Sequence, residues 1–218
     1  MGVAKVINSL MRKLPNWVVY IILVLPAVYL TFSLLGNQLG PDPIRTYQHK
    51  VGEFGLKLII IGLFVTPLRD LVNINFFKFR RCIGLVAFLY VCLHFLSYLI
   101  LDQSLNFNEV WKDIVKRPYI TFGIMSAGIM FFLSLTSNNL SVKKLGPIYW
   151  KRLHQLVYLV SVGAVMHFLL LTKTWQIEPV IYAIILIGLL GYRALKACHK
   201  RILNKKKIFL KILEYLKK

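Results

Sequence analysis

The sequence is poor in acidic residues and cysteines, and it lacks the glycine-rich motif of a dinucleotide-binding domain. Asp and Glu number 8 in 218 residues, against 28 Lys and Arg. The three cysteines, Cys82, Cys92 and Cys198, have the spacing of neither a zinc site nor a disulfide framework, which favours packing roles for them. No Gly-x-Gly-x-x-Gly is present, which argues against a nucleotide-binding βαβ unit.

Long apolar runs are abundant instead. Hydrophobic residues make up 57% of the chain, too many for an ordinary soluble domain. Most of six apolar segments approach the roughly 20 residues that a helix needs to cross the hydrocarbon core. The second is short and contains Lys57, so we expect it to extend back to Val51 and Lys57 to snorkel. The segments are Trp17–Leu35, Phe54–Leu68, Cys82–Leu101, Pro118–Thr136, Leu153–Thr172 and Pro179–Leu195.

The net charge of +20 is distributed as in a membrane protein, not as in a nucleic-acid-binding protein. With six spans and a cytoplasmic N-terminus, 21 of the 28 basic residues fall on the inner side. This is the positive-inside pattern, and it predicts that both termini are cytoplasmic. An odd number of spans would destroy the asymmetry. We therefore expect the basic charge to face lipid headgroups and the cytoplasm, and no nucleic-acid partner.

The predicted fold is an all-α integral membrane protein, a six-transmembrane-helix bundle with a C-terminal basic amphipathic helix. We assign residues 1–198 to the transmembrane domain and residues 199–218 to a cytoplasmic tail. In that tail, apolar residues at positions 209, 212, 213 and 216 follow a helical period, and lysines fill much of the remainder. This pattern favours a helix lying on the anionic inner leaflet of the membrane.

Three histidines lie inside the predicted spans, where ionisable side chains are costly and usually functional. His94 is about 10 Å from the outer end of its helix and His167 about 7 Å from the outer end of its own, at 1.5 Å per residue. Both belong to spans that run in the same direction, so the two rings are predicted to lie at one level. His154 lies about 20 Å lower on the helix of His167 and cannot pair with it.

Two imidazoles from facing helices are a common way to hold haem iron from both sides. Small and aromatic neighbours, among them Gly163, Ala164 and Phe168, could shape a slot for a porphyrin. Zinc is disfavoured because no third Cys, Asp or Glu ligand is expected at that depth. The absence of Cys-x-x-Cys-His excludes covalent c-type attachment. The other interpretation is that each histidine merely hydrogen-bonds a neighbouring helix.

The remaining histidines give weaker signals. His154 could serve a second haem only with helix distortion and a further ligand, because Arg80 and Arg81 stand where a partner histidine would be needed. His49, on an outer loop, and His199, among lysines, fit solvated residues better than ligands.

Several motifs, taken together, resemble the MsrQ (YedZ) family, haem-binding membrane subunits within the ferric-reductase-like transmembrane superfamily. They are DPIRTYQHKVGEFGLKL, TPLRD, RRCIGLVAFLYVCLHFLSY, KRPYITFGI and KKLGPIYWKRLHQLVYLV, followed by His167. The family's three membrane histidines match His94, His154 and His167. Arg80 and Arg81 occupy the position of the fourth histidine of the related NADPH oxidases.

The resemblance implies b-type haem, FMN and a place in the bacterial inner membrane. It also implies electron transfer from the quinone pool to a periplasmic molybdopterin-dependent methionine-sulfoxide reductase, which repairs oxidised envelope proteins. A basic group on the inner side is our candidate for a flavin phosphate or a haem propionate: Arg80, Arg81, Lys151 and Arg152. Such a group also fits plain positive-inside charge.

Two other functions remain open from the sequence. One is a stand-alone haem-containing metalloreductase that acts on ferric or cupric ions at the outer face. The other is a small transporter or structural anchor in which the histidines relay protons.

Overall fold

A computed structural model describes residues 2–171 and 176–216, with side chains up to residue 203. Throughout these residues the regular structure is helical. The helices are α1 (Val3–Lys13), α2 (Asn16–Leu35), α3 (Pro43–Val72), α4 (Arg80–Leu96), α5 (Phe107–Lys116), α6 (Pro118–Leu135), α7 (Asn139–His154), α8 (Val157–Leu171) and α9 (Ile177–Leu216). A 3₁₀ turn, η1 (Phe77–Phe79), precedes α4, and a π-helical segment, η2 (Ser97–Asp102), continues it.

Six segments within the described residues are long and apolar enough to cross a membrane, which confirms the predicted six-span all-α bundle. Their bounds are Asn16–Leu35, Pro43–Val72, Phe77–Asp102, Pro118–Leu135, Asn139–Leu171 and Ile177–Leu203. The second is much longer than predicted, because α3 begins at Pro43, where Asp42 caps it by accepting a hydrogen bond from the Arg45 N–H.

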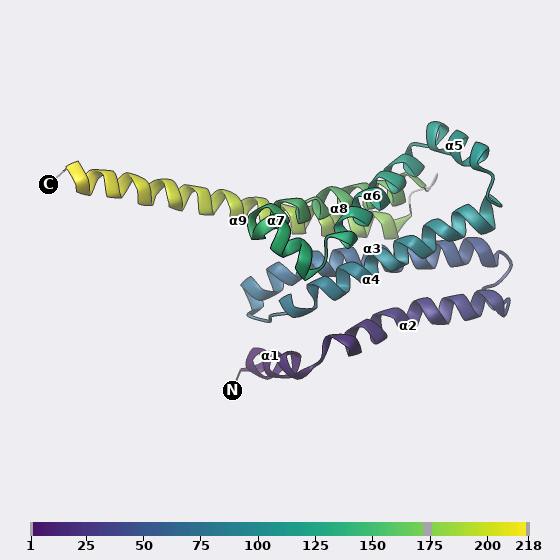
Figure 1. The fold of residues 1–218 in the computed structure, drawn as a ribbon, viewed down its shortest axis with the longest axis horizontal. Coiled ribbons are helices and arrows are strands. Elements are labelled where there is room, and N and C mark those ends of the chain that lie inside the picture. The colour runs from purple at the N-terminus through teal and green to yellow at the C-terminus, as the bar shows by residue number, and fades with distance from the viewer. Residues whose placement is uncertain (1, 172–175, 217–218) are drawn as a thin grey trace.

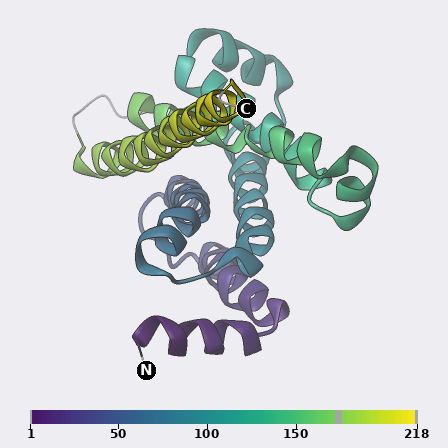
Figure 2. The same cartoon turned by 90° about the vertical axis from the view of Figure 1, so that its left-hand side faces the viewer.

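The spans run alternately in opposite directions (Figure 1). The loop after α2, helix α5 and the start of α9 lie at one end of the bundle, which we call the α5 end. Helix α1, η1 and α7 lie at the other, the α1 end, and α9 extends beyond it. Viewed from the α1 end, α1 lies across the bundle and not along it (Figure 2). The orientation of these ends across a membrane stays a prediction.

Two of the connections between the predicted spans contain helices of their own, α5 and α7. Asn106 caps α5 by accepting a hydrogen bond from the Glu109 N–H, and Asn138 caps α7 in the same way through Ser141. In both cases the Asn side chain accepts a hydrogen bond from the backbone N–H three residues later, as is typical at the start of a helix. Helix α7 is sharply kinked at Gly146, whose φ of 75° suits glycine.

Lys57 is not alone in its span. Its ammonium lies 2.8 Å from a carboxylate oxygen of Glu53, one turn earlier on α3, and the hydroxyl of Tyr182 on α9 donates to the same oxygen at 2.9 Å. The Lys57 side chain is 41% exposed, compatible with the predicted snorkelling. Pairing within the membrane segment lowers the cost of this charge.

A proline on α3 is compensated by an arginine on α9. Pro67 has no N–H, so the carbonyl of Leu63, four residues earlier, lacks its normal helical donor. The Nη2 atom of Arg193 donates to that carbonyl at 2.7 Å and approaches the hydroxyl of Thr66 at 3.3 Å. A neighbouring helix thus supplies the hydrogen bond that the proline removes, as spans in lipid require.

The core between α2, α3 and α4 is built around Tyr90, which is fully buried. Its ring stacks on Phe54 with a centroid separation of 5.7 Å, and its hydroxyl donates to the carbonyl of Leu23 at 3.0 Å. That carbonyl lies beside Pro26, and α2 remains helical through it. Tyr90 therefore joins three spans by packing and one hydrogen bond.

Helix α9 continues past residue 198 to Leu216 without a break. The side chains from residue 204 onward lie outside the described residues. The amphipathic face of the 199–218 tail and its boundary as a separate unit stay predictions.

Candidate functional site

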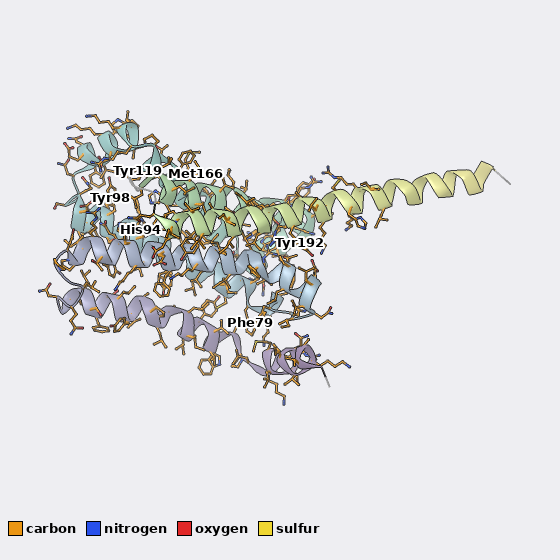
Figure 3. All side chains as sticks on the ribbon, turned by 180° about the vertical axis from the view of Figure 1, so that it is seen from behind. Phe79, His94, Tyr98, Tyr119, Met166 and Tyr192 are labelled. Carbon is orange, nitrogen blue, oxygen red and sulfur yellow. The ribbon has the colours of Figure 1, made fainter. Side chains whose placement is uncertain are left out.

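Two of the three predicted membrane histidines meet at the α5 end. His94 on α4 and His167 on α8 have ring centroids 5.9 Å apart, with the ring planes at 83° to each other. Helix α4 packs chiefly on α3, and α8 chiefly on α6, so the two rings face each other between two helix pairs. Figure 3 shows His94, Tyr98 and Tyr119 gathered at this end, with Phe79 near the other.

Each ring is held from behind by a main-chain carbonyl. The Nδ1 atom of His94 lies 2.9 Å from the carbonyl oxygen of Gln48, and Nδ1 of His167 lies 2.6 Å from that of Tyr119. A carbonyl can only accept, so Nδ1 carries the proton in both rings. Each neutral imidazole then keeps the lone pair of Nε2 for a ligand. This is the tautomer that a metal-binding histidine needs, fixed by a second hydrogen bond.

The two histidines line a cavity of about 600 Å³. Its walls come from α3, α4, α6 and α8 and are mainly apolar, with polar side chains at the α5 end. The size and the composition are those of a cofactor or ligand pocket. Besides the histidines, the lining includes Gly52, Ile59, Val91, Phe95, Gly123, Ala127, Val160, Ala164 and Phe168.

Two arginines and one amide provide donors around the cavity. Arg45 and Arg117 both line it, and Arg117 pairs with Asp113 at 3.1 Å. The hydrogen bond to the hydroxyl of Tyr119 raises the pKa of Arg117, and the Asp113 carboxylate adds to this, against an opposing effect of partial burial. The Nε2 atom of Gln48 is buried without a hydrogen-bond partner among the residues that the structure describes. A buried amide donor without a partner is rare and points to a missing acceptor.

None of these three donors was among the predicted site residues. Arg117 directly precedes Pro118, the first residue of a span, and Arg45 lies three residues before Gln48. The sequence feature that could have indicated them is their position: all three are polar residues at the span ends nearest the paired histidines. His49, which the sequence indicated as a solvated residue, is exposed and also borders the cavity.

His154 lies in a different environment at the α1 end. Its Nε2 atom is 3.1 Å from the hydroxyl of Thr136, and its ring stacks on Trp150 with centroids 4.0 Å apart. The helix is interrupted immediately afterwards, at Gln155 and Leu156, so α7 and α8 are separate helices. The helix is thus distorted next to His154, and the Nε2 atom of His154 is engaged with the hydroxyl of Thr136.

The four basic residues proposed for a propionate or phosphate do not line the cavity. Arg81 donates to the side chain of Asn139 at 2.9 Å, and the Arg152 guanidinium lies 5.9 Å from the ring of Tyr149. Arg80 begins α4 and Lys151 belongs to α7, both at the α1 end. His199 is exposed.

A conventional metal centre is not formed by the described residues. No group of three or more His, Cys, Asp or Glu side chains is arranged there to hold a metal ion. What remains is a pair of facing imidazoles in a large apolar cavity, which suits a planar group held from both faces.

Comparison with known proteins identifies the family. The model of the ferric-reductase-like transmembrane component matches residues 51–165, more than half of the chain. The chain is also 45% identical over 177 residues to the protein-methionine-sulfoxide reductase heme-binding subunits MsrQ of Brucella ovis, Brucella canis and Brucella suis. The aligned part covers 81% of this chain and 80% of each relative.

The chain belongs to the MsrQ family. It is a multi-pass membrane protein with six apolar helices among the described residues. The segment matched by the family model runs from α3 into α8 and contains His94 and His154, and it ends two residues before His167. No solved structure matches the chain.

Proposed function

We propose that the chain is the haem-binding membrane electron-transfer subunit of a protein-methionine-sulfoxide reductase system, with b-type haem held between His94 and His167. The observation that carries the proposal is the pair of facing imidazoles, each with Nδ1 bound to a carbonyl and Nε2 left for iron. The relatives are named as heme-binding subunits of protein-methionine-sulfoxide reductase.

The spacing of the rings fits an iron held from both sides. Two metal–nitrogen bonds of about 2 Å, with roughly 1 Å from each ring centre to its coordinating nitrogen, require centroids about 6 Å apart. The observed separation is 5.9 Å. The cavity of about 600 Å³ is of the size that a cofactor requires. Both observations support a bis-imidazole site between α4 and α8.

The donors around the cavity fit the carboxylates that haem carries. Arg45 and Arg117 line the cavity as cations, and the amide of Gln48 lacks an acceptor. A guanidinium suits a carboxylate because its planar fork donates two parallel hydrogen bonds. We assign the propionate role to these residues in place of the basic group at the α1 end. The group Arg80, Arg81, Lys151 and Arg152 stays a proposal for a phosphate at that end.

The chain itself positions the two imidazoles and surrounds the cavity with apolar side chains. The carbonyls of Gln48 and Tyr119 hold the imidazoles, and apolar side chains such as Val91 and Phe168 exclude water from the cavity. When bound, haem supplies one-electron transfer at a potential tuned by its axial ligands and surroundings. No catalytic residue for substrate chemistry is required of this chain.

The direction of transfer follows from the orientation that the charge pattern predicts. Basic residues concentrate at the α1 end and along α9, so the positive-inside rule places this end in the cytoplasm. The histidine pair then lies in the outer half of the bacterial inner membrane. This position favours delivery of electrons to a periplasmic molybdopterin-dependent reductase. We propose the respiratory quinone pool as the donor and FMN as a further cofactor on the family resemblance.

Absorbance spectroscopy of the purified protein tests the haem assignment. We expect a reducible bis-imidazole b-type spectrum, with haem quantified as the pyridine haemochrome. His94→Ala and His167→Ala should remove most of the haem, and His199→Ala, an exposed histidine, serves as the matched control. Unchanged haem in both ligand variants would refute the site.

A stand-alone ferric or cupric metalloreductase would use the same haem without a protein partner. Membranes that contain this chain, with and without the partner reductase, separate the two functions. In the proposed system, oxidation of the reduced haem by methionine sulfoxide requires the partner. Rapid oxidation of the haem by ferric citrate alone, at the rate seen with the partner, would favour the metalloreductase.

A further inference from the structure

Two glycines repeat the same relation to the two histidines. The carbonyl that binds His94 belongs to Gln48, and Gly52 follows four residues later on α3. The carbonyl that binds His167 belongs to Tyr119, and Gly123 follows four residues later on α6. The pairs α3–α4 and α6–α8 are also the two most closely packed helix pairs of the bundle.

The four-residue spacing has a direct geometric consequence. In an α-helix the carbonyl of residue i accepts from the N–H of residue i+4, and side chains lean toward the N-terminus. The side chain at i+4 therefore lies beside the carbonyl of residue i. A glycine there leaves the second lone pair of that carbonyl open to a donor from another helix.

The histidine rings occupy the space that a side chain would fill. A Cβ atom built on Gly123 would lie 2.8 Å from Nδ1 of His167 and 3.1 Å from its Cε1. A Cβ built on Gly52 would lie 3.0 Å from Nδ1 of His94 and 3.1 Å from its Cε1. Both contacts involve the nitrogen that donates to the carbonyl. An alanine at either position would push the ring away from its hydrogen bond.

We propose that Gly52 and Gly123 are positioning residues that fix the orientation, tautomer and donor strength of the two haem ligands. The inference rests on the proposed function, since it assigns these histidines to haem. Each glycine acts through the carbonyl one turn earlier, which holds Nδ1–H and directs Nε2 into the cavity. The same device, used once in each helix pair, makes the two sides of the site equivalent.

The hydrogen bond also affects the haem potential. Donation from Nδ1–H to a carbonyl raises the basicity of the ring, and a more basic ligand favours ferric iron. Loss of this hydrogen bond should therefore raise the midpoint potential. A tenfold change in the ferric–ferrous equilibrium corresponds to 59 mV for one electron.

The test compares Gly52→Ala and Gly123→Ala with two matched glycines on the same helices. Gly62 on α3 would bring its Cβ no closer than 3.7 Å to Ile83, and Gly128 on α6 has nothing within 4 Å. All four replacements gain helix propensity equally. The full chain in lipid nanodiscs is measured for haem content, midpoint potential and the electron paramagnetic resonance of its ferric form.

We expect Gly123→Ala to lose haem affinity about tenfold and to raise the midpoint potential, as for the loss of an outer-shell hydrogen bond. Gly52→Ala should change both quantities in the same direction and by less, because its contact is looser. Gly62→Ala and Gly128→Ala should match the unmodified chain. If all four variants behave alike, the proposal is overturned.

A measurement without haem separates this inference from the proposed function. Nitrogen-15 NMR of the histidines in haem-free protein reports which ring nitrogen carries the proton. The unmodified chain should show Nδ1–H for His94 and His167, and the alanine variants a mixture of tautomers. Unchanged tautomers would overturn the positioning role even if haem binds. Thermal unfolding checks the fold, and Gly52→Ala carries the test if Gly123→Ala does not fold.

Discussion

The two ends of the bundle both contain histidine, yet they use it differently. At the α5 end, His94 and His167 bind carbonyls through Nδ1 and face each other across a cavity. At the α1 end, His154 has its Nε2 at the hydroxyl of Thr136 and its ring against Trp150. The role of a membrane histidine therefore depends on which ring nitrogen is hydrogen-bonded to the protein and on what lies opposite the other ring nitrogen.

The cations differ between the ends as well. Arg117 lines the cavity and is half exposed, whereas Arg193 is directed at the carbonyl freed by Pro67. Near the α1 end, Asp70 also receives hydrogen bonds from Arg69, Tyr192 and Lys196, so charge there is used to join α3 to α9. At the α5 end the donors lie beside a cavity, whereas Arg193, Tyr192 and Lys196 mainly join α9 to α3, with Nη1 of Arg193 buried without a partner among the described residues.

Replacement of either facing histidine should have the largest effect. In His94→Ala and His167→Ala we expect haem content to fall at least about tenfold, because loss of an axial ligand costs more than loss of an outer-shell partner. His154→Ala should keep most of the haem. Pyridine-haemochrome assays on purified variants measure this. If all three variants lost haem equally, the two ends would not differ in haem ligation.

Arg193→Met should destabilise the fold without changing the haem spectrum. The carbonyl of Leu63 would lose its donor in a buried setting, which costs about 1–3 kcal/mol. Thermal unfolding in detergent measures the effect, with Arg201→Met, at an exposed position of α9, as the control. A shifted haem spectrum with unchanged stability would mean that Arg193 serves the site.

Arg117→Gln should weaken haem binding modestly. The side chain is 52% exposed, so we expect loss of about 1 kcal/mol or less, a factor of about fivefold at most. Competitive haem transfer to an apo-acceptor protein measures the affinity. Arg80→Gln, at the α1 end, is the control and should leave the affinity unchanged. A larger loss of haem affinity in Arg80→Gln than in Arg117→Gln would instead support Arg80, Arg81, Lys151 and Arg152 as the propionate site.

Thr136→Val should have the smallest effect on haem. The substitution removes the hydroxyl near Nε2 of His154, yet no second histidine is brought to that ring in the described part of the chain. Haem per chain should therefore stay the same as in the unmodified protein. A gain of a second haem in this variant would show that only Thr136 prevents ligation at the α1 end.

The sequence predicted the six spans and the common level of His94 and His167, because the helical rise converts residue number into depth. It did not predict α5 or α7, since polar segments with Asn caps resemble loops when no apolar run accompanies them. The donors Arg45, Gln48 and Arg117 were missed for another reason. Arg45 and Gln48 on α3 are distant in sequence from Arg117, which precedes α6, and only the packing of the helices brings the two segments to one cavity.

The sequence by itself determined the class of the protein, the number of spans and the depth of each histidine, because hydrophobic length and the rise per residue are local properties. The tertiary structure alone decided which ring nitrogen is engaged and which donors surround the cavity. It also decided that Gly52 and Gly123 lie against the two rings. These features depend on the rotation of each helix about its axis, and packing between helices sets that rotation.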